Sequence, residues 1–411
     1  MMLKSGHHIS SGERDEIRRF LNHPDKKTTD DIMTNRVIRQ TMREPFHFEG
    51  IDVLPGTQAR IPLPVGLDPL GRDLSIPVHI LHGEKDGPIL TITSTIHGDE
   101  LNGVTIIRHL LYGMDLKPET SDDLVKVENL RGTLLIVPVC NPEAVILDTR
   151  RSSDGRDLNR CFPGSPNGTH SARIAHALFE QVVMRGKYLI DLHTAPARRT
   201  NAPHIRANCD REDSKDLARA FGTPIVLHSI GPEGSLRRTA TGLGIHSILL
   251  EAGTANVFEG GAIAVGVQGI MNVMIHLDMI DGNLRRPEWR LIVRKSRWIR
   301  SPRGGMLHPA IVAGELVDQG QPIAHVTNPL SGDAEAILSP MSGVAVGLAT
   351  SPIVREGDPV ANIASVQKKK THQKIRAAPM TEWTVKDVSE TLEDISDDES
   401  GACIDDTPED E

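Results

Sequence analysis

Between Ile76 and Ile280, short apolar segments alternate with segments whose apolar residues recur at the 3.6-residue spacing of an α-helix. Because each expected strand is followed by an expected helix, most strands should run parallel and be covered on both faces. The expected strands are 89–96, 134–139, 188–192 and 247–250, and the expected helices are 101–111, 172–183, 213–221 and 262–280. The sequence therefore predicts an α/β domain with a largely parallel, buried sheet.

The chain has 411 residues, which is more than one ordinary domain needs. We expect four parts: an N-terminal extension (1–50), the α/β domain (51–296), a small all-β domain (297–366) and a disordered acidic tail (367–411). The net charge is -9, but residues 387–411 alone contribute -12, which leaves +3 for the other 386 residues. This nearly neutral folded part does not indicate a nucleic-acid partner.

The four cysteines are widely spaced and form no Cys-x-x-Cys pair, and the N-terminus lacks the apolar core of a signal peptide. These features predict a cytoplasmic protein. The long apolar segment 262–280 contains Gln268, Asn272, His276 and Asp278, so we expect a buried or amphipathic helix and no membrane span.

The region after Arg297 contains an internal repeat. Residues 301–326 and 339–363 both open with Ser-Pro-x-x-Gly and close with Gly-(Gln/Asp)-Pro-(Ile/Val)-Ala, which predicts a pseudo-twofold pair of β units. Such a repeat resembles the barrel-sandwich domains that carry biotin or lipoyl groups. Those carriers need an exposed lysine, and no lysine occurs between Arg303 and Gln367. We therefore expect a cap or an oligomerisation module.

Three expected strands end in residues that bind metals. His97 follows the strand 89–96, with Glu100 three residues later, and His193 and Glu251 follow two other strands. Ligands bind outside the carboxyl ends of strands in open α/β sheets. Two imidazoles and a carboxylate form the three-ligand set that catalytic zinc uses. We expect His97, Glu100 and His193 to hold one zinc ion, with Glu251 as the base outside its coordination shell.

A basic segment follows the strand 134–139. Residues 150–164 contain several arginines, an asparagine and the turn-forming pairs Asp154-Gly155 and Pro163-Gly164. Arginine forks bind carboxylates with two hydrogen bonds. The segment is either a carboxylate-binding loop or a solvated basic loop.

Together these motifs resemble the succinylglutamate desuccinylase/aspartoacylase family, and their details resemble its predicted-deacylase branch. The motifs are Ile96-His-Gly-Asp-Glu100, Asp157-Leu-Asn-Arg160 before Phe-Pro-Gly, Asp191-Leu-His-Thr194 and Leu250-Glu-Ala-Gly253. The likeness runs from about residue 75 to 366. It implies a zinc-carboxypeptidase-like fold, with a mixed, mainly parallel sheet flanked by helices, and a zinc-dependent amidohydrolase that cleaves a small N-acyl amino acid into a carboxylate and a free amine.

The resemblance also implies roles for individual residues. His97, Glu100 and His193 would bind zinc, Glu251 would be the general base and acid, and Asn159 and Arg160 would bind the carboxylate of the substrate. The arginine that stabilises the oxyanion matches Arg151 best, with Arg150 and Arg156 as alternatives. Arg237 and Arg238 are either a solvated pair or contacts to the substrate.

Two alternatives use the same motifs differently. One is a metallocarboxypeptidase acting on peptide C-termini, and the other is a non-catalytic zinc-binding scaffold. In the leading interpretation the partner is a small N-acyl amino acid, and neither nucleic acid nor membrane is a partner. A homo-oligomer is an open alternative to a monomer.

Overall fold

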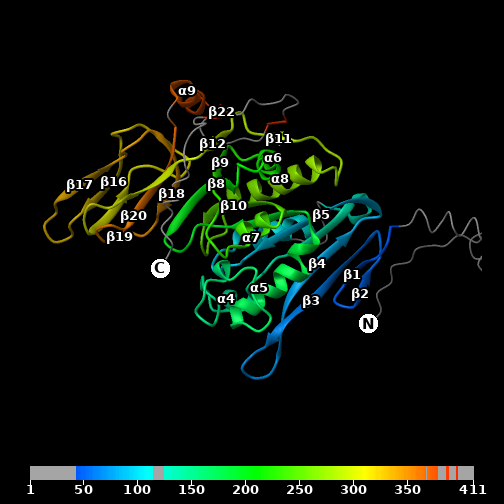
Figure 1. Cartoon of the computed structure of the whole chain (residues 1–411). Helices are drawn as coiled ribbons and strands as arrows, with labels where there is room; N and C mark the ends of the chain where they lie inside the picture. Colours follow the sequence, from blue (N-terminus) through cyan, green and yellow to red (C-terminus); the bar gives the residue numbers. More distant parts are fainter. Residues whose placement is uncertain (1–42, 114–124, 367, 378–385, 388–394, 397–411) are drawn as a thin grey trace, which may run out of the picture. The chain divides into compact units, whose positions relative to one another are not determined.

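The computed structural model describes residues 43–113, 125–366, 368–377, 386–387 and 395–396. A long twisted sheet dominates this part of the chain (Figure 1). Its strands, in spatial order, are β3 (Thr57–Leu67), β4 (Asp73–His82), β6 (Arg131–Val137), β5 (Lys85–Ser94), β7 (Tyr188–His193), β10 (His246–Thr254), β8 (Arg199–Ala207), β18 (Gly343–Ala349), β20 (Pro359–Ser365) and β13 (Ser296–Arg300). Strands β6, β5, β7 and β10 run parallel to one another, and the flanking strands on this path are antiparallel.

Helices cover both faces of the central strands. The helices in the described residues are α3 (Asn102–Tyr112), α4 (Pro142–Ile146), α5 (His170–Gln181), α6 (Glu212–Phe221), α7 (Leu236–Gly242), α8 (Gly260–His276) and, away from the central strands, α9 (Lys369–Ala377), with short 3-10 turns η1 (Val127–Asn129), η2 (Leu158–Arg160) and η3 (Val183–Arg185). Consecutive residues of β7 point to opposite faces. Ile190 therefore packs in the core under α3, α6 and α8, whereas Leu189 packs in the core with α5 and α7. The predicted α/β class is confirmed.

The predicted elements lie close to the observed ones. Their bounds differ from the expected ones by at most four residues. The last helix, for example, was expected to reach Ile280 but ends at His276 as α8. Asp278 adopts a left-handed backbone conformation (φ 57°), which cannot continue a right-handed helix. No helix in the described ranges is long and apolar enough to cross a membrane.

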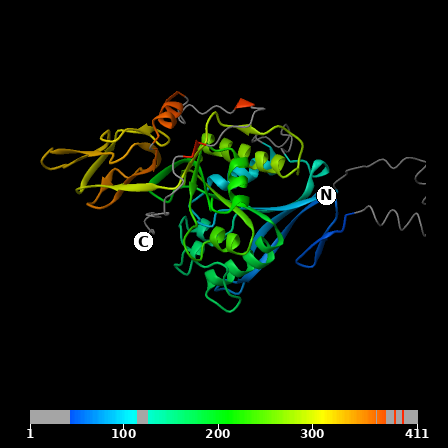
Figure 2. The same ribbon diagram turned by 45° about the horizontal axis from the view of Figure 1, so that its top comes forward.

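The C-terminal β domain packs two sheets against each other. One consists of β17 (Ala334–Leu338), β16 (Pro322–Thr327), β14 (Gly305–Pro309) and β19 (Ile353–Val354), and the other is the end of the long sheet formed by β18, β20 and β13, with β15 (Leu316–Val317) beside β18. Apolar side chains of both sheets, such as Ile323 and Ile363, form its core. Both views show these strands, coloured yellow to orange, at the β8 end of the sheet (Figures 1 and 2).

The internal repeat has a structural counterpart. Ser301 and Ser339 each donate a hydrogen bond from the hydroxyl to the carbonyl two residues later, at 2.7 and 2.6 Å. Strands β16 and β20 each begin at the proline of the closing motif. The two copies therefore begin and end alike. The longer strands of the first copy lie in the four-stranded sheet and those of the second copy in the long sheet, while the short strand of each copy joins the sheet of the other.

The remaining described strands lie around the long sheet. They are β9 (Ile225–His228) and β12 (Leu291–Val293), which extend it beside β8, the pair β1 (Phe46–Phe48) and β2 (Ile51–Val53), the pair β11 (Arg285–Arg286) and β21 (Lys386–Asp387), and β22 (Ile395–Ser396). Helix α9 lies within the range that was assigned to the disordered tail, and its Ile375 is buried in an apolar cluster. Most of the rest of that tail lies outside the described residues. Residues 1–42 of the predicted extension lie outside them entirely.

Candidate functional site

The loop after β5 presents His97 and Glu100. Gly98 at its centre leaves room for the neighbouring chain, because a β-carbon there would lie 2.1 Å from the carbonyl carbon of Ala144. The amide of Gly98 also donates to the carbonyl of Thr149 at 2.9 Å. These contacts fix the loop against α4 and the segment that follows it, so its two polar side chains have defined positions.

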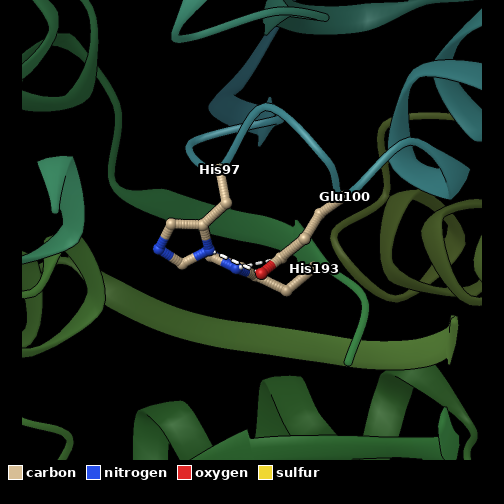
Figure 3. A group of neighbouring side chains, drawn as sticks. All are labelled: His97, Glu100 and His193. Carbon is tan, nitrogen blue, oxygen red and sulfur yellow. Dashed lines mark hydrogen bonds and ion pairs between the residues drawn. The ribbon is translucent and has the colours of Figure 1, made fainter. Parts of the chain in front are cut away.

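His97, Glu100 and His193 meet in one buried cluster (Figure 3). Nδ1 of His97 lies 2.6 Å from Oε1 of Glu100, and Nδ1 of His193 lies 2.8 Å from Oε2. One ligand atom from each residue lies within 4.8 Å of the others, and each residue is at most 5% exposed. Burial alone would raise the pKa of Glu100, but the two histidines outweigh it and hold that pKa well below its usual value.

Each imidazole is oriented by a second carboxylate. Nε2 of His97 lies 3.1 Å from Oδ1 of Asp157, and Nε2 of His193 lies 2.8 Å from Oδ2 of Asp191. Because an ionised carboxylate only accepts hydrogen bonds, each Nε2 donates to its aspartate. Each Nδ1 faces Glu100, and a metal ion at this point would replace the Nδ1 proton and use the lone pair. Histidine ligands of metals are held in this way. The donor set of two Nδ1 atoms and one carboxylate therefore fits a zinc ion.

Arg150, and not Arg151, reaches the cluster. Its guanidinium lies 3.1 Å from Oε1 of Glu100 and 3.2 Å from Oδ2 of Asp157. The side chain of Arg151 is exposed and donates to the carbonyl of Gly155, and Arg156 is exposed as well. Of the three arginines considered for the oxyanion, Arg150 is the one whose guanidinium reaches the cluster, and its role there stays a prediction. Two successive side chains of this extended loop point in different directions, which motif spacing does not resolve.

Asn159 and Arg160 lie on η2 beside the cluster. Asp157 starts this turn by accepting the amide of Asn159 at 2.8 Å, so the residue that orients His97 also shapes the turn. The amide oxygen of Asn159 accepts the backbone N–H of Leu236 at 2.9 Å. Both predicted residues line the same cavity as the cluster.

Glu251 lies inside β10 rather than just beyond the end of a strand. It pairs with His193 as the last residue of the parallel ladder between β10 and β7, and β10 then continues beside β8 to Thr254. Oε2 of Glu251 accepts a hydrogen bond from Nδ2 of Asn201 at 3.0 Å, and Oε1 lies 3.7 Å from Nε of Arg206. Burial raises the pKa of Glu251, although Arg206 opposes the effect.

One cavity of about 560 Å³ joins these groups. The predicted residues that line it are His97, Glu100, Asn159, Arg160, His193 and Glu251, together with Arg237 and Arg238. Residues that motif reading did not single out are Arg199, Asn201 and Arg206 of β8, and Trp298 of the β domain. Six arginines and three glutamates line the cavity, so its charge favours an anion.

Three comparisons with known proteins agree on what the chain is similar to. Residues 86–277 match the model of the succinylglutamate desuccinylase/aspartoacylase catalytic domain. N-alpha-acetyl-L-2,4-diaminobutyric acid deacetylase of Halomonas elongata is 27% identical over 305 residues, which are 71% of this chain and 86% of that protein.

Solved structures are similar over most of the chain. The succinylglutamate desuccinylase/aspartoacylase of Rhodobacter sphaeroides has a TM-score of 0.66 and 25% identity, over 80% of this chain and 100% of that one. The product-bound ectoine utilization protein EutE (DoeB) of Ruegeria pomeroyi also has a TM-score of 0.66, with 21% identity over 79% of this chain and 99% of that one. The second likeness concerns the fold alone.

Proposed function

Because the chain belongs to the succinylglutamate desuccinylase/aspartoacylase family, we propose that it is a zinc-dependent amidohydrolase that removes the acyl group from a small N-acyl amino acid. The observation that carries this proposal is the buried cluster of His97, Glu100 and His193 in one cavity with Glu251. Three metal ligands and a separate carboxylate that can move a proton suit metal-assisted hydrolysis of an amide.

The metal has a defined place in the proposal. Nδ1 of His97, Nδ1 of His193 and the carboxylate of Glu100 would hold one zinc ion per chain. When bound, zinc supplies Lewis acidity, which polarises the carbonyl of the substrate and lowers the pKa of water. Asp157 and Asp191 keep the two imidazoles in the tautomer that leaves Nδ1 available.

Glu251 moves the proton. Its carboxylate accepts a proton from the attacking water as the water oxygen bonds to the acyl carbon. It then delivers this proton to the amide nitrogen as the C–N bond breaks. The products are the acyl carboxylate and the free amine. The raised pKa of Glu251 suits a group that must hold the proton between these two steps.

The arginines bind negative charge. Arg150 lies at the cluster and donates to the oxygen that becomes negative in the transition state. Asn159 and Arg160 bind the carboxylate of the amino acid, because an arginine fork and a neighbouring amide offer several donors to its two oxygens. The excess of arginines in the cavity supports an acidic group on the substrate.

A panel of substrates tests the proposal. N-acetyl, N-succinyl and N-formyl amino acids and short peptides are assayed for release of free amine, with and without a chelator. We expect one class of N-acyl amino acid to be hydrolysed and the chelator to abolish the reaction. Preference for peptides would identify a metallocarboxypeptidase, and zinc binding without any hydrolysis would identify a scaffold.

The same proposal includes a cytoplasmic location. Cys140, Cys161 and Cys209 are free thiols, which agrees with a reducing compartment. Fractionation of the producing cells, with antibody detection of the chain, tests the location independently of activity.

A further inference from the structure

A row of directly opposed residues crosses the sheet from the β domain to the active site. Trp298 of β13 pairs with Asn362 of β20, which pairs with Gly347 of β18. Gly347 pairs with Asn201 of β8, which pairs with Gly253 of β10. Directly opposed residues of neighbouring strands project to the same face. The row therefore brings Trp298 to the face of the sheet that carries Glu251.

The bulge in β8 puts Asn201 on this face. Glu251 pairs with His204 and Gly253 pairs with Asn201, so the one residue between them in β10 faces two residues in β8. Such an extra residue changes the face to which the following side chains point. Asn201 can therefore donate to Oε2 of Glu251 at 3.0 Å, and the row ends at the proposed base.

Gly347 leaves the space that this arrangement needs. A β-carbon at position 347 would lie 2.9 Å from Oδ1 of Asn201 and 3.4 Å from Cη2 of Trp298. The tip of the indole and the amide of Asn201 therefore approach the same point from two sides. Any side chain at this position would push against the amide that holds Glu251.

The indole of Trp298 is held in place while it lines the cavity. The guanidinium carbon of Arg199 lies 4.9 Å from the centre of the ring, a distance typical of a cation–π contact. Arg199 also lines the cavity and pairs with Ala349 of β18. A fixed aromatic ring forms a rigid wall at low cost in conformational entropy.

We propose that Trp298 is a specificity-determining residue that limits the size of the substrate group lying beside Glu251, and that Gly347 positions both Trp298 and Asn201. This inference rests on the proposed deacylase function. It gives the β domain a direct part in the choice of substrate.

Two substrate series test the role of Trp298. One varies the acyl group on alanine (formyl, acetyl, butyryl), and the other varies the N-acetyl amino acid (glycine, alanine, leucine). For each series we compare the ratio of kcat/KM for the largest substrate to kcat/KM for the smallest. In Trp298→Ala this ratio should exceed that of the wild type by about tenfold or more in one of the two series. Trp298→Phe should show a smaller change of the same sign. The matched control is Trp289→Phe, because Trp289 is buried and lies outside the cavity lining.

Gly347→Ala tests the positioning role. Displacement of Asn201 should lower kcat about tenfold or more, while zinc content stays that of the wild type. Gly261→Ala is the control, because position 261 is exposed in α8, has open space around it and no left-handed backbone conformation, and lies away from the row. Circular dichroism separates a local effect from loss of folding.

Fluorescence gives a readout that does not depend on turnover. N-acetylalanine is titrated into the full-length Glu251→Gln protein, with and without zinc, and tryptophan emission is recorded. We expect emission to change on binding, and the change to disappear when Trp298→Phe is added. The same change in both proteins would overturn the inference.

The outcomes separate the inference from the proposed function. If the wild type releases no amine from any substrate, the proposed function fails, and the fluorescence result alone decides whether Trp298 contacts the ligand. If the wild type is active but both series keep their wild-type ratios in Trp298→Ala, the specificity role is wrong and the deacylase proposal stands.

Discussion

Nε2 of His193 lies 2.8 Å from Oδ2 of Asp191, while Nδ1 of the same ring faces Glu100. The other oxygen of Asp191 accepts the hydroxyl of Thr93 at 2.7 Å. Thr93 and Asp191 both lie in strands, so the Asp191 carboxylate has a fixed position and holds the ring in one orientation with Nε2 as a donor. Since the zinc proposal depends on the free lone pair at Nδ1, this contact supports the whole cluster.

Asp191→Asn should weaken zinc binding without removing a ligand. The amide cannot stabilise the donating Nε2 as a carboxylate does, and loss of such contacts commonly costs 10- to 100-fold in metal affinity. Competition with a chromogenic chelator measures the affinity. Asp148→Asn is the control, because Asp148 is exposed and has a left-handed conformation that asparagine accepts. Equal affinities in the two variants would refute the role of Asp191.

Arg150→Gln and Arg151→Gln should differ sharply. The guanidinium of Arg150 lies at the cluster, whereas that of Arg151 is exposed. Loss of a donor to a developing oxyanion typically costs 10²- to 10³-fold in kcat. We therefore expect a loss of about this size for Arg150→Gln and nearly wild-type kinetics for Arg151→Gln. The reverse order of effects would restore Arg151 as the oxyanion residue.

Glu251→Gln should keep the metal and lose the reaction. Glu251 is not among the three clustered ligand residues, so one zinc per chain should remain. Without a carboxylate to carry the proton, kcat should fall by about 10²- to 10⁴-fold. Elemental analysis and amine release are measured on the same preparation. A near-normal kcat would show that another group is the base.

His204 should make stability depend on pH. This side chain is fully buried, and burial lowers its pKa from the ordinary value of 6.5 to about 3, with Arg206 adding to the effect. Below about pH 6.5 the unfolded chain therefore binds a proton that the folded protein does not bind until about pH 3. Between these values the free energy of unfolding should fall by about 1.4 kcal/mol per pH unit on account of this residue.

His204→Asn tests this dependence. The asparagine amide can still donate to the carbonyl of Ala202, as Nδ1 of His204 does at 2.8 Å, but it does not titrate. Urea unfolding at about pH 6 and about pH 5 should show a smaller loss of stability in the variant, by about 1 kcal/mol. Identical losses in both proteins would mean that His204 does not titrate as its burial implies.

The fold class and the cluster could be predicted because they depend on local patterns. Each central strand is a short apolar run, and the side chains at its carboxyl end meet those of its parallel neighbours. His97 and His193 therefore came together as expected. Glu251 was expected at a strand end, and it is the last residue of the parallel pairing although β10 itself continues.

Features that depend on register and on distant pairing could not be predicted. Asn201 reaches Glu251 because of a bulge in β8, and a bulge leaves no clear signal in one sequence. Trp298 reaches the cavity because β18 pairs with β8, which joins the β domain to the central sheet. Which of two neighbouring loop side chains points into the site, as for Arg150 and Arg151, likewise depends on tertiary contacts. The spacing of a sequence motif carries no information about those contacts.

The most direct measurement is a zinc titration of the metal-free protein, followed by release of free amine from the best N-acyl amino acid of the panel. The account predicts no release without zinc, a linear rise as zinc is added, and a break at one zinc per chain. Full activity of the metal-free protein, or zinc binding at that stoichiometry without any release of amine, would contradict it.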